Sequence, residues 1–273
     1  MQHFFFIFIV TWNALDHLKT FLPSVMETTY EDFEIIIADN ASTDGTRRWI
    51  EENAPGCRIV TFDDNYGYCG GNNRAVPYAK GDILLFLNND VRVEPDWLHH
   101  LNQSFQDKQT GAVQPKMRSH LEPGAFEYAG AAGGMIDWLG YPFCRGRIFE
   151  HVEQDDGQYD DESDIFWASG AALAIRKDLF RELRGFNEDF EFHMEEIDLC
   201  WRVWKAGYRV RFQPGSIVYH LGGGSLPMGS PRKVYYNYRN SLMMLAINLE
   251  HFVWPKLFFR LCLDGIAGIR SLL

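Results

Sequence analysis

Polar residues with ligand-binding chemistry follow three apolar runs of the sequence, at the point where each run ends. The runs cover residues 4–10, 33–38 and 83–87, and the segments behind them are Thr11-Trp12-Asn13, Asp39-Asn40-Ala41-Ser42-Thr43-Asp44-Gly45-Thr46 and Asn88-Asn89-Asp90. The carboxyl ends of parallel strands meet at one edge of a sheet, and folds of this kind bind their ligands there. We therefore expect these segments to form one binding site.

Two aspartates in these segments have functional interpretations. Asp39 stands where the second run ends, and its carboxylate can accept hydrogen bonds from a base or a ribose hydroxyl. Thr43 and Asp44 are better explained as caps of the helix that follows. Asp90 can bind a divalent cation that carries a diphosphate, because Mg²⁺ is typically held by one or two carboxylates and by phosphate oxygens. Taken alone, Asp90 also fits an ordinary turn.

Residues 65–74, Asn-Tyr-Gly-Tyr-Cys-Gly-Gly-Asn-Asn-Arg, form a glycine-dense segment. We predict a turn whose backbone approaches a ligand closely, as phosphate-binding loops do. The spacing is not G-x-G-x-x-G, so the segment is not a dinucleotide-binding fingerprint. Its weight in the prediction therefore depends on the polar segments around it.

An α/β sheet is the arrangement that would position these residues. The three apolar runs are typical of parallel strands covered on both faces, and residues 14–28 and 46–54 between them have helix-compatible spacing. The sequence therefore predicts a doubly wound sheet. Residues 4–10 are too short to span a bilayer and have neither a basic leader nor a cleavage site behind them. We interpret them as a buried strand and not as a signal peptide.

The alternation of apolar runs and helix-compatible segments weakens beyond residue 110. Residues 111–159 are glycine-rich, and we predict long loops with at most a short hairpin. An acidic run predicts a solvated loop, with metal binding as the weaker alternative; its residues are Asp155, Asp156, Asp160, Asp161, Glu162 and Asp164. Order returns at residues 167–183 and in a helix over 195–207, followed by short strands at 210–212 and 217–219.

Composition and charge exclude several classes of protein. The chain has 273 residues, of which 46% are hydrophobic and 15% aromatic, so it is globular and neither disordered nor a coiled coil. Its net charge of −11 has the wrong sign for neutralising phosphates, so we expect no nucleic-acid partner. Five scattered cysteines without a C-x-x-C pair suggest neither a disulfide framework nor structural zinc, and fit a reducing cytoplasm.

Taken in order, these segments resemble those of family-2 glycosyltransferases with the GT-A fold, in particular the bacterial rhamnosyltransferase-like branch. The matching segments are Val10-Thr11-Trp12-Asn13, residues 39–46 and 65–74, Leu87-Asn88-Asn89-Asp90-Val91, and Gly185-Phe186-Asn187-Glu188 leading into Glu195-Glu196-Ile197-Asp198-Leu199-Cys200-Trp201-Arg202. The resemblance covers roughly residues 5–240, and the ordered set is more specific than any single motif. It implies inverting transfer of a sugar from a nucleoside diphosphate donor to an acceptor hydroxyl.

The resemblance also implies roles for individual residues on the donor side. Asp39 would contact the base, Asn88 would lie near the ribose, and the nucleotide pocket would include Thr11, Asn13 and Asn73. Asp90 would ligate Mg²⁺ or Mn²⁺. The family often shows Asp-x-Asp here, so Asn88 removes one negative charge and leaves Asp90 as the principal carboxylate. His220 matches a histidine that completes the metal site in some relatives, because imidazole is an acceptable ligand for Mn²⁺. A structural histidine is the alternative.

Glu195-Glu196 occupies the place of the family's Glu-Asp motif, whose second acid is the usual catalytic base. The resemblance thus implies Glu196 as the base, within about 3 Å of the attacking hydroxyl. Because glutamate is one methylene longer than aspartate, the backbone at Glu196 would have to lie slightly further from the acceptor. The alternative is that Glu195 is the base. Both acids also favour the first turn of a helix through its dipole, and Asp198 can pair with Arg202 at i, i+4.

Trp167-Ala168-Ser169-Gly170-Ala171 would lie near donor and acceptor in this family. Small residues such as Ser169 and Gly170 admit a sugar, and Trp167 or Trp201 could stack on one, although Trp201 fits the core better. Asp198 is a further candidate on the acceptor side, with its pairing to Arg202 as the favoured alternative.

The C-terminal region is predicted to be helical from about Pro231, after Gly222-Gly223-Gly224, with a break at Pro255. Residues 256–263 are apolar with scattered cations, which is typical of an interfacial helix; packing on the main domain or on another subunit is an equal alternative. The ending Arg270-Ser271-Leu272-Leu273 lacks a polar tail and suggests a shortened C-terminus.

We expect a GT-A catalytic domain over residues 1–230, divided into a nucleotide-binding half (1–110) and an acceptor-side half (111–230), followed by a helical segment over 231–273. The expected donor is a UDP- or dTDP-linked sugar, and the expected acceptor is a saccharide or lipid-linked saccharide of bacterial surface polysaccharide synthesis. The expected location is the cytoplasm, with a contact to the inner face of the membrane. The alternatives are a non-catalytic sugar-nucleotide-binding subunit and a nucleotidyltransferase. The second lacks support, since Thr11-Trp12-Asn13-Ala14 supplies no basic triphosphate loop.

Overall fold

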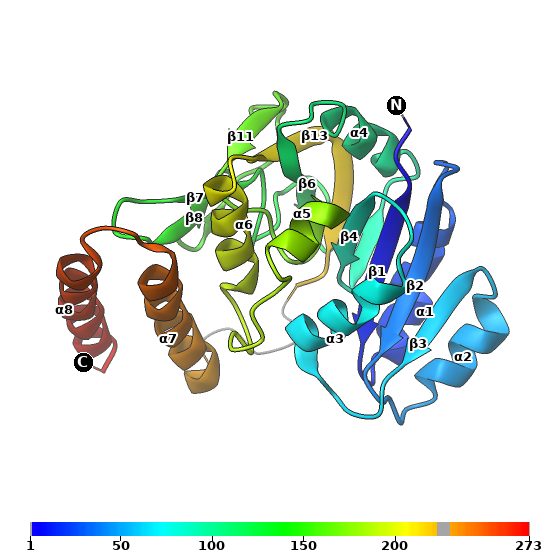
Figure 1. Cartoon of the computed structure of the whole chain (residues 1–273), viewed down its shortest axis with the longest axis horizontal. Helices are drawn as coiled ribbons and strands as arrows, with labels where there is room; N and C mark the ends of the chain where they lie inside the picture. The colour runs from blue at the N-terminus through cyan, green and yellow to red at the C-terminus, as the bar shows by residue number, and fades with distance from the viewer. Residues whose placement is uncertain (1, 223–229, 273) are drawn as a thin grey trace.

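A nine-stranded sheet runs through the part of the chain that the computed structural model describes, residues 2–222 and 230–272 (Figure 1). Its strand order is β11-β13-β6-β12-β4-β1-β2-β3, with β5 paired to β13. One half consists of parallel strands, β1 (Phe5–Thr11), β2 (Phe33–Asp39), β3 (Cys57–Thr61) and β4 (Ile83–Leu87). The register pairs Thr11 with Asp39 and Asp39 with Thr61, so the polar strand ends align at one edge.

Helices cover both faces of this sheet, which explains why β1 is apolar from Phe5 to Val10. Phe6 and Phe8 contribute to a core that also contains side chains of α3 (Gly67–Ala75), α5 (Lys177–Glu182) and α6 (Glu195–Lys205). Phe5, Ile7 and Ile9 contribute to the opposite core, which is completed by α1 (Leu15–Met26), α2 (Thr46–Asn53) and α4 (Trp97–Ser104).

The other half of the sheet mixes directions. It contains β5 (Val91–Val93), β6 (Thr110–Ser119), β11 (Ser163–Ile165), β12 (Ala172–Arg176) and β13 (Arg209–His220). β12 runs antiparallel to β4 and β6, whereas β6 and β13 are parallel. The predicted α/β fold, a mostly parallel sheet with flanking helices, is confirmed.

Two predictions for this half are corrected. The ten residues of β6 form a strand inside the sheet, where the sequence predicts loops, because Gln114, Pro115 and Lys116 interrupt its apolar pattern. The two short strands predicted at 210–212 and 217–219 are one strand, β13, with irregular pairing to β6 between Gln213 and Ile217. The predicted hairpin exists twice, as β7 (Gly134–Ile136) with β8 (Pro142–Cys144) and β9 (Arg147–Ile148) with β10 (His151–Val152).

The acidic run is only partly the solvated loop that the sequence predicts. The side chain of Asp155 is fully buried, where it accepts hydrogen bonds from Lys116 Nζ at 3.0 Å and from Arg118 Nε at 2.8 Å. Asp160 also binds Lys116 but is exposed. Arg118 and Lys116 outweigh the cost of burial and hold the pKa of Asp155 below its ordinary value. This ion-pair cluster anchors the loop to β6.

The glycine-dense segment is a helix, α3, and not the predicted turn. A Cβ at Gly71 would lie 2.9 Å from Val10 Cγ1 and 3.1 Å from both side-chain atoms Oδ1 and Nδ2 of Asn40. The missing side chain therefore lets α3 lie directly against the ends of β1 and β2. Close approach is the reason for glycine here, as predicted, but the partner is the sheet.

Two helices, α7 (Pro231–Asn248) and α8 (Val253–Leu272), form a hairpin at the end of the molecule opposite β3 (Figure 1). Ser230 Oγ caps α7 by accepting a hydrogen bond from the Lys233 N–H at 3.3 Å. The predicted break is real but precedes Pro255, which lies in the first turn of α8, where proline costs no hydrogen bond. Gly223 and Gly224 lie outside the described residues. No described helix is both long enough and apolar enough to cross a bilayer.

Candidate active site

Asp39 and Thr11 lie side by side at the ends of β2 and β1, and both are buried. Asp39 Oδ1 accepts a hydrogen bond from the Ser42 N–H at 3.1 Å. Within residues 2–222 and 230–272, neither Thr11 Oγ1 nor Asn40 Oδ1 has a hydrogen-bond partner, although both atoms are sealed from solvent. Buried polar atoms rarely remain unsatisfied, so this edge has the character of a site for a polar ligand.

Asn13 connects the two loops at this edge. Its Oδ1 accepts a hydrogen bond from the Thr43 N–H at 2.7 Å, and its own N–H donates to Ser42 Oγ at 2.9 Å. Asn13 adopts a φ of +48°, a conformation that asparagine tolerates better than most residues. Asn13 is exposed, so its primary contribution in the structure is to hold the rim of the strand ends together.

The N-cap position of α2 is Gly45, and neither Thr43 nor Asp44 occupies it as the sequence predicts, but the Asp44 side chain still binds the start of the helix. Asp44 Oδ1 accepts hydrogen bonds from Thr46 N–H at 3.0 Å and Oγ1 at 2.6 Å, and Oδ2 accepts from Leu15 N–H at 3.1 Å. Burial raises the pKa of Asp44, but these hydrogen bonds outweigh it and lower the pKa below the ordinary value. One carboxylate thus fixes the first turns of α1 and α2.

Asn73 joins α3 to the loop before α6. Its Oδ1 accepts from the Phe186 N–H at 3.0 Å, and its Nδ2 donates to the Phe186 carbonyl at 2.8 Å and to Glu188 Oε1 at 3.2 Å. Arg74 forms an ion pair with the same Glu188. The amide of Asn73 therefore has a structural role in joining these segments, and its expected nucleotide contact stays a prediction.

Asp90 and His220 meet at the junction of β5 and the end of β13. His220 Nε2 lies 3.2 Å from Asp90 Oδ1, and both side chains are buried. Two cis ligands of an octahedral cation with bonds of about 2.1 Å stand roughly 3 Å apart, so this pair fits Mg²⁺ or Mn²⁺. Among the described residues, no group of three or more histidine, cysteine, aspartate or glutamate side chains is arranged to hold a metal ion, so Asp90 and His220 are the two candidate ligands here.

Glu127 lies on the other side of the histidine ring, with Oε1 3.3 Å from His220 Nδ1. A carboxylate that faces the second ring nitrogen is the usual way of orienting a metal-binding histidine. Burial lowers the pKa of His220, but the two carboxylates outweigh burial and raise it to about 10. Burial likewise raises the pKa of Asp90, and His220 outweighs it, so that the pKa of Asp90 is lowered. Sequence analysis missed Glu127, since it lies where loops were predicted.

The turn that carries Asn88 is tied to residues 169–171. The Asn88 N–H donates to the Ala171 carbonyl at 2.9 Å, and Asn88 is half-buried. Gly170 lies next in the chain, and a Cβ there would stand 3.7 Å from Glu196 Cβ and 3.3 Å from the Tyr68 hydroxyl. The segment thus joins the metal-side turn to the start of α6, and Gly170 leaves space beside Glu196.

Glu195 and Glu196 begin α6, and both are half-buried, with Oε2 atoms sealed from solvent. In the part of the chain that the structure describes, neither Oε2 has a hydrogen-bond partner. Burial raises the pKa of Glu196 to about 7. Burial and the neighbouring charge of Glu196 raise the pKa of Glu195 well above its ordinary value. Close to neutral pH, this pair can therefore accept a proton.

The backbone before these glutamates is strained. His193 and Met194 adopt φ values of +65° and +76°, which cost energy in residues other than glycine. Asn240 of α7 holds the strained turn, since its Nδ2 donates to the carbonyls of Phe192 at 2.6 Å and His193 at 2.9 Å. The hydroxyl of Tyr236, also on α7, donates to Glu191. The C-terminal helix is therefore part of the support of the candidate catalytic acids, which the sequence does not reveal.

Asp198 is buried and belongs to this support, which favours the pairing with Arg202 over the expected acceptor contact. Its Oδ2 accepts from Arg202 Nη2 at 2.6 Å and Nε at 2.9 Å, which confirms the i, i+4 pair. Its Oδ1 accepts from Asn248 Nδ2 at 2.7 Å. Both carboxylate oxygens are thus used inside the protein.

Trp167 and Ser169 are buried beneath the site. The Trp167 indole donates to the Met135 carbonyl at 2.8 Å and packs on Gly134, so it is a core residue and not the expected sugar platform. Ser169 Oγ donates to the Ala129 carbonyl at 2.8 Å, and the Ser169 N–H donates to Gln114 Oε1 at 2.8 Å. Tyr68, which sequence analysis passed over, reaches the site instead, with its hydroxyl donating to the Gly170 carbonyl at 2.7 Å.

Comparison with known families decides the class of this protein. The family model described as "Glycosyl transferase family 2" matches residues 6–184, which include the strand ends and the Asn88–Asp90 turn. The chain belongs to glycosyltransferase family 2. The resemblance inferred from the sequence is thereby confirmed.

Two curated relatives of this family-2 glycosyltransferase come from bacteria. The O-antigen biosynthesis protein RfbC of Myxococcus xanthus is 33% identical over 71% of the chain, and the chain spans only 15% of that protein. The N-acetylglucosaminyl-diphospho-decaprenol L-rhamnosyltransferase of Mycobacterium tuberculosis is 27% identical over 96% of the chain and 90% of its own length.

Solved glycosyltransferases share the fold. GalNAc-T7 with UDP, GalNAc and Mn²⁺ matches at a TM-score of 0.66 and 18% identity, covering 85% of this chain and 46% of its own. The mannosyltransferase PcManGT of Pyrobaculum calidifontis, in complex with GDP-Man and Mn²⁺, matches at 0.65 and 17% identity over 98% and 76%. The fold of the chain is therefore GT-A, as predicted.

Proposed function

We propose that this family-2 glycosyltransferase is an inverting enzyme that transfers a sugar from a UDP- or dTDP-linked donor to a hydroxyl of a saccharide or lipid-linked saccharide. The observation that carries the proposal is the pair Glu195-Glu196, half-buried at the start of α6 with Glu196 beside Gly170. The rhamnosyltransferase and the O-antigen protein among its relatives support a role in synthesis of bacterial surface polysaccharide. The location that we propose is the cytoplasm, at the inner face of the membrane.

The donor half of the site would hold the nucleotide at the strand ends. Asp39 would accept hydrogen bonds from the pyrimidine, and the unsatisfied Thr11 hydroxyl would bond within the same pocket. Asn88 would lie near the ribose, and its side chain is half-buried. Asp90 and His220 would bind Mg²⁺ or Mn²⁺, with Glu127 orienting the imidazole. A divalent cation bound there supplies charge neutralisation for the leaving diphosphate.

The acceptor half would supply the base. The acceptor oxygen attacks the anomeric carbon as the bond from that carbon to the diphosphate breaks, and the hydroxyl proton passes to a Glu196 carboxylate oxygen. A single displacement of this kind inverts the configuration at the anomeric carbon. The pKa of Glu196, raised to about 7 by burial, suits a base that works near neutral pH. Tyr68 and Gly170 would shape the space beside it.

Ligand-dependent thermal shifts provide the first test of the proposal. UDP, dTDP and GDP are each added with and without Mn²⁺, since a ligand at about 100 times its dissociation constant stabilises a protein by roughly 2.7 kcal/mol. We expect a metal-dependent shift with UDP or dTDP and none with GDP. Transfer or hydrolysis of the matching sugar nucleotide then separates an enzyme from a non-catalytic binding subunit, which would show the shift without turnover.

A further inference from the structure

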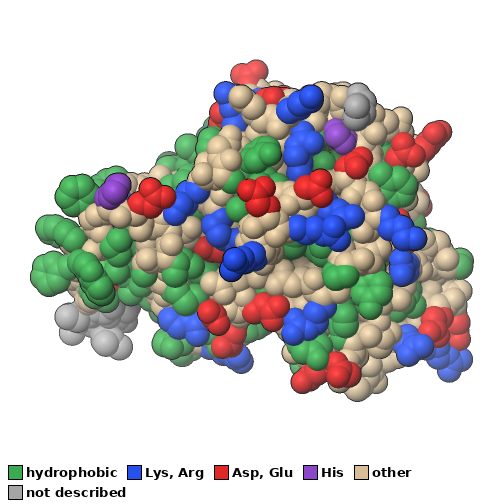
Figure 2. All heavy atoms as spheres, viewed as in Figure 1, with side chains coloured by type: hydrophobic (Ala, Val, Ile, Leu, Met, Phe, Trp, Pro, Cys, Tyr) green, Lys and Arg blue, Asp and Glu red, His purple; other side chains and the backbone are tan. Residues whose placement is uncertain are grey.

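The exposed surface of helix α8 is apolar. Trp254, Phe258, Phe259, Leu261 and Ile266 are between 56% and 81% exposed, and Phe252 just before the helix is 80% exposed. Figure 2 shows hydrophobic side chains gathered at this end of the molecule. A patch of this kind on a soluble domain marks an interaction site.

Two charged residues of α8, Arg260 and Asp264, face the protein, whereas Lys256 is half-buried beside the exposed aromatic side chains in the sequence. Arg260 is 1% exposed, and its guanidinium stacks 3.5 Å from the centre of the Tyr141 ring and donates to the Leu139 carbonyl and to Ser241 Oγ. Asp264 accepts a hydrogen bond from the Tyr141 hydroxyl at 2.6 Å. On an ordinary surface helix the apolar side chains face the protein, whereas on α8 many of them face the solvent. The buried polar contacts of Arg260 and Asp264 fix this orientation of the helix.

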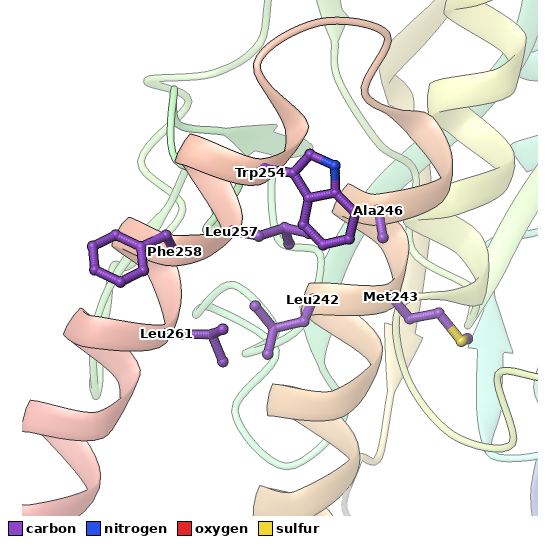
Figure 3. A pocket seen from close by; sticks show the side chains of 7 residues that line it. All are labelled: Leu242, Met243, Ala246, Trp254, Leu257, Phe258 and Leu261. Atoms are coloured by element: carbon purple, nitrogen blue, oxygen red, sulfur yellow. The ribbon is translucent and has the colours of Figure 1, made fainter.

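An apolar groove of about 450 Å³ lies between α7 and α8. Leu242, Met243 and Ala246 line it from α7, and it is completed from α8 by Trp254, Leu257, Phe258 and Leu261 (Figure 3). The groove opens beside the exposed aromatic side chains, so the apolar surface continues from the helix face into the hairpin.

The charge of this hairpin differs in sign from that of the rest of the chain. Residues 231–273 contain six Lys or Arg against two Asp or Glu, whereas residues 1–230 contain 20 against 35. The net charges are therefore +4 and −15. Cations beside an exposed aromatic and aliphatic surface are the signature of a helix that lies in the interface of an anionic bilayer. Two copies of a positively charged hairpin would repel each other, which disfavours self-association.

We propose that the α7–α8 hairpin docks on an anionic lipid surface, with the exposed face of α8 inserted among the headgroups and acyl chains. The choice of the anionic cytoplasmic leaflet as the partner rests on the proposed function. The apolar surface of α8 is observed independently of that function. α7 also holds the turn before Glu195 through Asn240, so the docked hairpin would place the acceptor half of the site next to the membrane.

Flotation of the full chain with lipid vesicles tests this docking. Vesicles of phosphatidylethanolamine and phosphatidylglycerol at 3:1 are compared with vesicles of phosphatidylcholine alone, without donor or acceptor. We expect the full chain to bind the anionic vesicles. Binding should be at least tenfold weaker to phosphatidylcholine vesicles and at high salt, and equally reduced in the double variant Trp254→Ser/Phe258→Ser. Lys256→Glu should weaken binding several-fold at low salt only.

Phe149→Ser is the matched control, because Phe149 is an aromatic side chain at least as exposed as Trp254 and Phe258 and lies outside α7 and α8. It should leave vesicle binding unchanged. Equal binding of the double variant, or no binding to either vesicle, would overturn the proposal. So would concentration-dependent dimerisation that the double variant abolishes, since the surface would then bind a second copy. Nucleotide-induced thermal shifts measured on the same variants keep this result separate from a failure of the proposed function.

Discussion

The candidate site contains a buried pair of ionisable residues, Asp90 and His220, and a half-buried pair, Glu195 and Glu196, and their pKa values are shifted by different causes. At Asp90 and His220, partners of opposite charge outweigh burial, so the pKa of Asp90 falls and that of His220 rises to about 10. At Glu195 and Glu196, burial is not opposed by a cation, and the pKa of Glu196 rises to about 7. The first arrangement keeps Asp90 charged and His220 protonated, so that a metal would have to displace the proton from His220 Nε2, and the second lets a carboxylate exchange a proton.

The largest expected effect comes from the second group. Glu196→Gln removes the proton acceptor while keeping the size of the side chain, so turnover should fall by about 10²–10⁴-fold, the usual contribution of a general base. Nucleotide-induced thermal shifts should stay near those of the unaltered protein. Glu195→Gln is the matched control: if it abolishes turnover while Glu196→Gln stays active, the base is Glu195.

Variants of the first group should act on metal and not on the base. Asp90→Asn removes the charged ligand, so the Mn²⁺-dependent part of the UDP or dTDP thermal shift should disappear. Glu127→Gln should weaken Mn²⁺ affinity by about 10–100-fold, because it removes only the carboxylate that orients His220. A titration of Mn²⁺ at saturating nucleotide measures both. An unchanged Mn²⁺ response in Asp90→Asn would remove Asp90 from the metal site.

The raised pKa of Glu196 predicts the pH dependence of the enzyme. The base must be deprotonated, so kcat/KM should fall about tenfold for each pH unit below about 7. Stability should change in the opposite direction: a carboxyl whose pKa is raised on folding favours the folded state at low pH and loses that contribution as pH rises through the folded pKa. Glu196→Gln should flatten the stability profile between pH 5 and 8, as measured by thermal unfolding. A profile identical to that of the unaltered protein would show that Glu196 does not titrate there.

The smallest expected effect concerns the support of the catalytic turn. Asn240→Ala leaves the carbonyls of Phe192 and His193 without their donor, which should destabilise the fold by about 1–3 kcal/mol. We expect kcat to fall more than KM changes, because the strained turn that presents Glu196 would relax. Asn237→Ala, on the same helix, is the control and should change neither. A loss of stability without any change in kcat would make Asn240 purely structural.

The sequence by itself determined the parallel half of the fold and the strand-end loops. β1, β2 and β4 are mostly apolar because both faces of the sheet are covered, and polar residues stand at or directly after the end of each strand. Asp39 and Asp90 could be found for the same reason. Asp198 and Arg202 could be paired because helical spacing is a local property.

Only the tertiary structure decided the rest, since it depends on contacts between residues far apart in sequence. The sequence does not reveal strand β6, because its buried Lys116 is paired with Asp155, nearly 40 positions away. Glu127 and Asn240 have no local pattern that marks them, and they gain a role only where His220 and the turn before α6 are brought to them. The glycines of α3 predict close approach, but whether a ligand or the sheet approaches is decided by where Val10 and Asn40 lie. Local periodicity can be read from the sequence, whereas the partner of a buried polar group depends on which distant residues the fold brings next to it.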